Sequence, residues 1–204
     1  MTARRRDQPL TRDELLDAAL RIVDSQGLAA LTMRRLADAL GVEAMSLYHH
    51  VPNKDALLEW TVERMRSEMR LPDPLPEDWV DLMAAIFGEY GRVLAAHPNL
   101  LPFAGRTTGG VEPTGLAFLI ATGFEPDDAV ELLQSLAAFT VGFSILRAPS
   151  AQVDAPQTTR DLAERSREWR DETCHRGLRM IMEAYRPRRH PDRGSRATDA
   201  GRRS

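Results

Sequence analysis

The sequence has little of what sheets, disulfides and membrane spans require. β-Branched residues are sparse, and no segment alternates apolar and polar residues between two turns, which excludes a sheet-rich fold. Cys174 is the single cysteine, so no internal disulfide can form and a reducing cytoplasm is the expected compartment. No apolar run approaches the length of a membrane span, and the start, MTARRRDQPL, lacks the apolar core of a secretory signal. The composition therefore favours a cytoplasmic all-α protein that has no membrane partner.

Catalytic motifs are missing as well. There is no nucleophile elbow, no glycine-rich phosphate loop, no GxGxxG followed by an acidic partner and no triad of metal ligands. The acidic cluster of Asp73, Glu77 and Asp78 falls in a proline-rich stretch with the composition of a solvated linker. These absences predict that the chain is not an enzyme and that it has no catalytic residues, no cofactor and no metal site.

Charge is distributed unevenly along the chain. Residues 1–70 carry 11 basic and 11 acidic side chains, residues 71–185 carry 9 and 17, and residues 186–204 carry 7 arginines against 2 aspartates. An acidic middle is unsuited to a polyanion, so the ends of the chain would have to hold any nucleic-acid partner. We expect a flexible basic leader over residues 1–10 and a disordered basic tail over residues 186–204. For both segments, nonspecific contact with DNA and plain solvation remain open.

Helical periodicity dominates what remains of the sequence. Thr11, with Glu14 three residues later, is a capping box for a helix that ends at Gly27. Thr32 can cap a short second helix that Gly41 ends, and the pattern also predicts helices over six later ranges: 42–51, 54–70, 76–97, 114–123, 125–148 and 161–185, the last with a break near Gly177.

Residues 33–51 have the spacing of a helix-turn-helix. Ala37 is a small side chain where the two helices cross, Gly41 tolerates the positive φ of the turn, and Leu47 is the large apolar anchor of the second helix. This arrangement leaves the second helix with an outer face. A recognition helix places such a face in the major groove of DNA.

The stretch LTMRRLADALGVEAMSLYHHVPNKDALL, with DELLDAALRIVDSQG before it, resembles the DNA-binding domain of TetR-family transcriptional repressors over residues 11–60. The second half resembles the effector domain of the tetracycline-repressor subgroup in its layout and in GFEPDDAVELLQSLAAFTVGF. The resemblance implies an all-α bacterial homodimer that binds a palindromic double-stranded DNA operator. We therefore expect a DNA-binding domain over residues 11–56 and a helical domain for effector binding and dimerisation over residues 57–185.

Carried onto this chain, the resemblance assigns DNA contacts to one residue before the turn, six on the recognition helix and one beyond it: Arg34, Ala44, Met45, Ser46, Tyr48, His49, His50 and Lys54. The first helical residues are small or flexible enough to approach base edges, and the later ones lie toward the phosphate backbone. For His50, a packing role is as open as a phosphate contact. A metal site at His49 and His50 is disfavoured, because adjacent helical residues point about 100° apart and no cysteine or third histidine is nearby.

Aromatic and methionine side chains at helical spacing in the second half suit an apolar ligand pocket, and each of them also suits a plain core. The candidates for the pocket are Met83, Phe87, Tyr90, His97, Phe103, Thr107, Phe118, Phe139 and Phe143. His97 has two open interpretations, a polar ligand anchor and a helix C-terminal histidine favoured by the helix dipole. The metal-ligand histidine of the tetracycline-repressor subgroup would fall at Ala104. We therefore do not extend the resemblance to tetracycline or magnesium, and the effector stays open.

Two apolar helices, over residues 127–146 and 161–185, are the candidates for a symmetric four-helix dimer contact. Their candidate interface residues are Leu133, Leu136, Ala137, Thr140, Val141, Leu178, Ile181 and Met182. The sequence thus predicts a homodimeric repressor that a small-molecule effector releases from its operator. A DNA-binding regulator that answers to a protein partner or to nothing, and an activator rather than a repressor, remain open alternatives.

Overall fold

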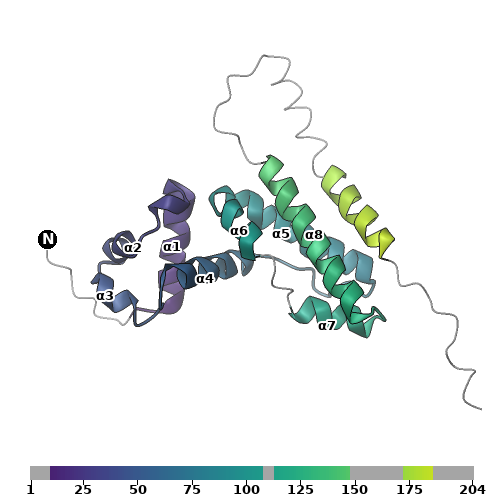
Figure 1. Cartoon of the computed structure of the whole chain (residues 1–204), viewed down its shortest axis with the longest axis horizontal. Helices are drawn as coiled ribbons and strands as arrows, with labels where there is room; N and C mark the ends of the chain where they lie inside the picture. Colours follow the sequence, from purple (N-terminus) through teal and green to yellow (C-terminus); the bar gives the residue numbers. More distant parts are fainter. Residues whose placement is uncertain (1–9, 108–112, 148–171, 186–204) are drawn as a thin grey trace, which may run out of the picture.

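The computed structural model describes residues 10–107, 113–147 and 172–185, and across these ranges every regular element is a helix. Figure 1 shows two groups of helices, with α1, α2 and α3 in one group and α5 to α8 in the other, and α4 reaching from the first toward the second. The predicted all-α fold, with an N-terminal helix-turn-helix domain and a larger helical domain, is confirmed.

α1 (Arg12–Gln26) is fixed at both ends by the residues that the sequence pattern indicates. The Glu14 N–H donates to Thr11 Oγ1 at 3.2 Å, and the Thr11 N–H donates to the Glu14 carboxylate at 3.1 Å, which completes the capping box. Gly27, at φ +83°, ends the helix by donating its N–H to a carbonyl of the last turn at 2.8 Å. A 3-10 turn, η1 (Leu28–Ala30), then leads toward the second helix.

α2 (Met33–Leu40) and α3 (Ala44–Leu47) form the helix-turn-helix around Gly41, whose backbone is left-handed at φ +67°. The prediction of a helix over residues 42–51 is wrong in length, because residues 48–50 form a turn held by hydrogen bonds from each N–H to the carbonyl three positions earlier. The following proline explains the early end, since proline lacks an N–H and disfavours the α conformation in the residue before it. The paired histidines therefore lie in a turn and not on a helix.

α4 (Lys54–Arg66) packs along α1 and leads out of the helix-turn-helix domain. Its N-cap is Asn53, whose side chain accepts a first-turn N–H at 2.8 Å. The helix ends before the predicted residue 70. Ser67 Oγ donates to Arg64 O at 2.7 Å, which is the competition with backbone bonding that ends many helices.

The second domain is built on two long helices, α5 (Trp79–Ala96) and α8 (Pro126–Arg147), which pack against each other. A 3-10 turn, η2 (Pro98–Leu100), follows α5 and leads into α6 (Leu101–Thr107). Both α6 and α7 (Pro113–Ala121) pack on α8. The largest fully buried side chains of this domain are apolar and include Met83, Leu94, Leu100, Leu119, Leu132 and Leu136.

The C-terminal helix, residues 172–184, lies beside α8 (Figure 1). It runs through Gly177 without the predicted break. A Cβ atom at this glycine would fall 2.3 Å from Cζ of Phe139 on α8, so the glycine permits a close approach of the two helices. Residues 161–171 of the predicted helix lie outside the described residues.

α8 is, within the described part of the chain, the one helix long and apolar enough to cross a membrane by length and composition. It packs against α5, α6 and α7, and Leu132 and Leu136 on its inner face are fully buried. The core helix of a globular protein passes the same test, and the packing of α8 is that of a core helix.

Candidate nucleic-acid interface and effector cavity

The outer face of α3 and of the turn behind it presents exposed side chains around one buried anchor. Leu47 is fully buried, whereas Met45 is 72% exposed and Tyr48 is 47% exposed. His49 and His50 are exposed as well, so the packing interpretation of His50 is wrong. One exposed surface therefore contains a thioether, a phenol ring and two imidazole rings. Exposed apolar and aromatic groups that cluster in this way are typical of an interaction site.

The other four candidates lie on and beside the same helix. Arg34 on α2 and Lys54 at the start of α4 are exposed, and Ala44 and Ser46 are half-buried on α3. Ser46 Oγ donates to Glu43 O, at the N-cap of α3, at 2.6 Å. The hydroxyl oxygen can therefore still accept a hydrogen bond from a partner but has no further proton to donate. All eight candidates thus lie on α2, on α3 and its turn, or at the start of α4. Their contact with DNA stays a prediction.

A cavity of about 440 Å³ lies between the last turn of α4, the segment behind it, and α5, α7 and α8. This volume is typical of small-molecule sites. Four of the nine predicted pocket residues line it: Met83, Phe87, Tyr90 and Phe118. The walls are thus mainly apolar and include three aromatic rings.

The remaining predicted pocket residues are not among those that line the cavity. Phe139 and Phe143 stack on each other with ring centroids 5.8 Å apart, and Phe139 packs toward the C-terminal helix. Phe103 is buried in the core. The side chain of Thr107 lies outside the described residues. Helical spacing identified inward-facing aromatic residues correctly but could not separate those that face a neighbouring helix from those that face a void.

The pocket residues predicted from the sequence include none on α4, although this helix lines the cavity. Glu63 and Arg66 line it from the last turn of this helix, Ser67 from its C-cap, and Leu71 and Leu75 from the proline-rich segment. The first three residues recur at i, i+3 and i+4, which places them on one face of the helix end. This spacing was the available signal, although it is equally typical of a solvated face.

Polar groups in the cavity wall are few. The Arg66 guanidinium lies 5.6 Å from the centroid of the Tyr90 ring and 3.6 Å from the Glu63 carboxylate. Tyr90 Oη is buried and has no hydrogen-bond partner among the described residues. A buried hydroxyl without a partner costs free energy. Tyr90 therefore lines the cavity while its buried hydroxyl is left unsatisfied by the protein's own described side chains.

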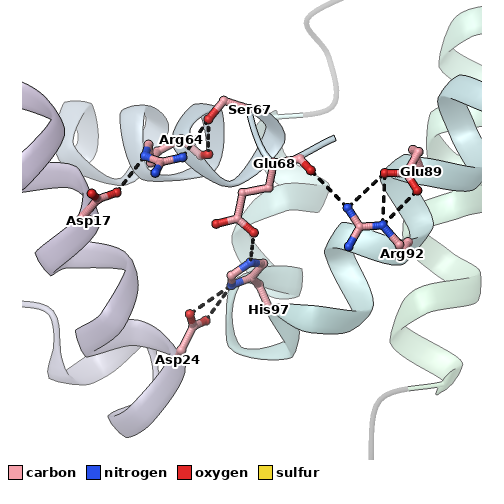
Figure 2. Close-up of polar contacts among 8 residues, drawn as sticks. All are labelled: Asp17, Asp24, Arg64, Ser67, Glu68, Glu89, Arg92 and His97. Carbon is pink, nitrogen blue, oxygen red and sulfur yellow. Dashed lines mark hydrogen bonds and ion pairs between the residues drawn. The ribbon is translucent and has the colours of Figure 1, made fainter. Parts of the chain in front are cut away.

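His97 lies outside the cavity, at the C-cap of α5. Figure 2 shows its ring between the carboxylates of Asp24 and Glu68, so of its two interpretations the structure supports the helix C-terminal one. Ala104, at the position of the subgroup's metal-ligand histidine, is fully buried, and its methyl group offers no ligand atom. Across the described ranges, no group of three or more His, Cys, Asp or Glu side chains could hold a metal ion.

The residues predicted for the dimer interface are mostly buried within the single chain. Leu133, Leu136, Ala137, Thr140, Val141, Leu178 and Met182 are buried, and Ile181 is half-buried. The large apolar side chains that these two helices expose, within the described residues, are Ile145, Leu146 and Met180. A buried side chain cannot meet a second protomer without rearrangement, so the interface stays a prediction for the two helices.

A helix-turn-helix with an exposed recognition face, joined by one helix to a cavity-bearing helical domain, is the architecture of a DNA-binding transcriptional regulator. The family model described as bacterial regulatory proteins, tetR family, matches residues 15–60. An HTH-type transcriptional regulator from Saccharopolyspora erythraea is 32% identical over 164 residues, which cover 78% of this chain and 70% of that protein. The chain belongs to the TetR family of transcriptional regulators.

Further relatives agree with this assignment. The tetracycline repressor protein class E from Escherichia coli is 30% identical over 156 residues, which cover 71% of this chain and 72% of that protein. The crystal structure of TetR from Acinetobacter baumannii AYE matches with a TM-score of 0.67 at 27% identity, covering 87% of this chain and 97% of that chain. Apo ActR from Streptomyces coelicolor matches with a TM-score of 0.69 at 25% identity over the same shares. The predicted family is confirmed, and so is the prediction that the protein is a regulator and not an enzyme.

Proposed function

We propose that the protein is a cytoplasmic homodimeric repressor that leaves a palindromic operator when a small, mainly apolar effector enters the cavity. The observation that carries this proposal is the position of α4. Its first residue, Lys54, belongs to the candidate DNA-binding surface, and its last turn, with Arg66, lines the cavity. A ligand that displaces the last turn therefore acts on a helix that also carries a DNA contact.

At the operator, we assign base readout to residues 44–46, because the N-terminal part of a recognition helix approaches the base edges of the major groove. The exposed Met45 thioether can meet a thymine methyl group. Arg34, Tyr48 and Lys54 contact phosphates on either side, and the two histidines of the turn extend this backbone contact. The N-terminus of α4 adds backbone N–H groups to the charge of Lys54.

Ligand and DNA complexes of relatives support this proposal without identifying the effector. A variant of TetR from Acinetobacter baumannii AYE has been solved with minocycline, and ActR from Streptomyces coelicolor has been solved with (S)-DNPA. BioQ, which shares the fold at 22% identity, has been solved with its double-stranded DNA operator. For this chain, the cavity volume and its aromatic walls favour a drug-sized molecule with a large apolar surface.

The exposed apolar side chains of α8 and the C-terminal helix support the homodimer. Leu146 is 84% exposed and Met180 is 65% exposed, and Ile145 lies beside Leu146 on the chain. Pairing of these two helices with their symmetry copies would cover all three side chains. A twofold axis would also place two recognition helices on the two half-sites of a palindrome.

Operator binding is tested by fluorescence anisotropy with duplexes from the DNA that flanks the gene, against a scrambled duplex. We expect tight, sequence-selective binding with two protomers per site, and weaker binding by Tyr48→Ala and Lys54→Ala. Equal and weak binding to every duplex, followed by failure of a selection from random duplexes with a folded dimer, would contradict the repressor function.

The effector response is tested by filling the cavity. Ala137 is buried and lines the cavity from α8, so Ala137→Phe should keep operator binding and lose release by compounds that release the wild type. Ala117→Phe on the exposed side of α7 is the matched control and should keep the response. If no compound in a broad apolar library shifts operator affinity, the regulator responds to a protein partner or to nothing.

A further inference from the structure

Three elements that are distant in sequence meet at His97. Its Nδ1 lies 3.0 Å from both carboxylate oxygens of Asp24, near the C-terminal end of α1, and its Nε2 lies 3.1 Å from Glu68 Oε2, just behind α4 (Figure 2). We call these three residues the His97 clamp. Since α1 belongs to the helix-turn-helix domain and His97 caps α5, the His97 clamp joins the two domains.

The geometry of the His97 clamp, with a carboxylate at each ring nitrogen, favours a charged ring. A neutral imidazole has one N–H, so it can donate to one carboxylate and must turn a lone pair toward the other. Only the imidazolium donates from both nitrogens. The His97 side chain is 9% exposed, and burial alone would lower its pKa, but the hydrogen bonds to Asp24 and Glu68 outweigh burial and raise the pKa above 6.5.

Neighbouring contacts hold the backbone of the two acidic residues in place. Asn99 Nδ2 donates to the carbonyls of Val23 and Asp24 at 2.9 and 3.0 Å, which fixes the end of α1 against η2. On the other side, Arg92 Nη2 donates to the Glu68 carbonyl at 3.0 Å and pairs with Glu89.

The charges around the ring are therefore the two carboxylates of the His97 clamp, with the Arg92 guanidinium next to Glu68 as the nearest cation among the described contacts. The C-terminal end of α1 adds a partial negative charge from its carbonyl groups. These surroundings favour the imidazolium. The hydrogen bonds of the neutral Asn99 side chain do not change with pH. They keep the end of α1 in contact with η2 whether the His97 ring is charged or neutral.

We propose that His97, as an imidazolium, is a positioning residue that sets the orientation of the helix-turn-helix domain on the effector domain and thereby its fit to the operator. Loss of the ring's second proton removes one of the ring's two hydrogen bonds and the charge attraction between the ring and both carboxylates, including that of Asp24 across the domain boundary. The joint then has more than one orientation. The His97 clamp is also connected to the cavity, because α5 lines the cavity and ends at His97.

The sign of the pH effect follows from the raised pKa. The His97 clamp stabilises the contact between the domains fully below pH 6.5, the ordinary pKa of a histidine. This stabilisation is lost as pH rises through the higher pKa that His97 has in the folded protein. His97→Gln keeps a side chain that forms hydrogen bonds but cannot carry the charge. This variant should behave at every pH as the wild type does at high pH.

The orientation can be measured by the distance between two spin labels in the full chain. In a Cys174→Ser background, Ala39→Cys on α2 and Ala117→Cys on α7 place one label on an exposed site of each domain. The labelled protein is mixed with excess unlabelled protein, so that distances within one protomer dominate. We expect one narrow distance population below pH 6.5 and a second population at about pH 9.5.

Variants separate a charge effect from loss of structure. His97→Gln should show both distance populations at each pH, and Asp24→Asn and Glu68→Gln should show them at lower pH than the wild type. Asp81→Asn removes an exposed pair with Arg179, in which both side chains are more than half exposed, and should change nothing. Helical content from circular dichroism must stay constant in all variants.

Operator binding gives a second readout that does not depend on any effector. The ratio of the wild-type Kd to the His97→Gln Kd cancels the pH effects of all groups that the two proteins share. We expect this ratio to differ from one below pH 6.5 and to approach one at high pH. A ratio that is constant across this window, or a single distance population in His97→Gln, would overturn the proposal and leave the effector response untouched.

Discussion

The two domains of this protein divide their residues in different ways. In the helix-turn-helix domain, the side chains that hold the fold and those that face outward are separate: Leu47 is fully buried, and Met45, two positions away, is 72% exposed. In the second domain, Met83 and Phe87 are buried in the core and also line the cavity. A substitution in the first domain can therefore change stability or binding alone, whereas one at the cavity changes both.

The difference follows from the size of the partners. A DNA duplex is large, so the surface that reads it must protrude into a groove and stay exposed. A small molecule is bound by being surrounded, which requires apolar walls, and such walls are core residues by composition. Binding residues that are separate from the core are therefore expected in the DNA-binding domain and not in the second domain.

The largest expected effect is that of removing the anchor of α3. Leu47→Ala should lower the free energy of unfolding by about 2–5 kcal/mol, because it leaves a cavity where the side chain is fully buried. Met45→Ala should change it by less than about 0.5 kcal/mol and still weaken operator binding. Urea unfolding and anisotropy titrations measure the two quantities. Equal losses of stability in both variants would break the proposed separation.

A smaller effect is expected where the second domain has a residue that serves the fold alone. Gly177→Ala should destabilise the protein by about 1–2 kcal/mol, because the new Cβ would meet the Phe139 ring on α8 and overpacking outweighs the better helix propensity of alanine. Gly142→Ala on α8, where a Cβ meets nothing within 4 Å, is the control and should be neutral or stabilising. Thermal unfolding measures both. A stabilised Gly177→Ala would mean that the ring moves aside freely.

At the cavity, Tyr90→Phe should shift stability and ligand binding in opposite directions. The Tyr90 hydroxyl is buried without a partner among the described residues, so its removal should stabilise the free protein by about 1 kcal/mol. An effector whose entry exposes this hydroxyl and supplies the missing hydrogen bond should bind the variant more weakly. Chemical unfolding of the free protein and titration with compounds found by operator release measure the two effects. A destabilised variant would indicate that the hydroxyl has a partner after all.

The smallest effect on stability is expected at Lys54, the only lysine and an exposed residue at the start of α4. Lys54→Ala should leave unfolding unchanged within about 0.5 kcal/mol. It should weaken operator binding for all sequences alike and reduce the slope of log K against log salt by about one for each phosphate that the lysine neutralises. Titrations over a salt series, with Lys54→Arg as the charge-keeping control, measure this. An unchanged slope would remove Lys54 from the DNA-binding surface.

Local chemistry explains how much of this structure could be predicted from the sequence. Thr11, Gly41 and Asn53 act on backbone groups within a few positions, and the helix boundaries they predict are those observed. The predicted length of α3 is wrong, because the helical apolar pattern continues into the turn that follows. In this turn, hydrogen bonds to carbonyls three positions earlier satisfy the backbone N–H groups instead of helical ones. The division into two domains could be predicted from the sequence, because the candidate recognition residues lie close together in it.

What could not be predicted depends on residues that are far apart in the chain. His97 and Asp24 are separated by 73 positions, and no pattern within either helix indicates that they meet. The same holds for Arg66 and Tyr90, whose contact follows from the angle between α4 and α5. Whether an apolar helix face meets another helix or a void depends on packing geometry, which composition does not specify.

The length of α4 has a mechanical consequence. A helix of 13 residues is a stiff rod about 20 Å long, so a tilt of about 5° at the cavity shifts its other end by about 2 Å. That displacement is larger than the range over which a hydrogen bond to a phosphate survives. In a twofold-symmetric pair, two such rods tilt in opposite directions, and the gap between the two recognition surfaces changes by twice the amount. Under the proposed function, a small molecule in the cavity would in this way detach the protein from a rigid duplex while both helix-turn-helix units keep their internal structure.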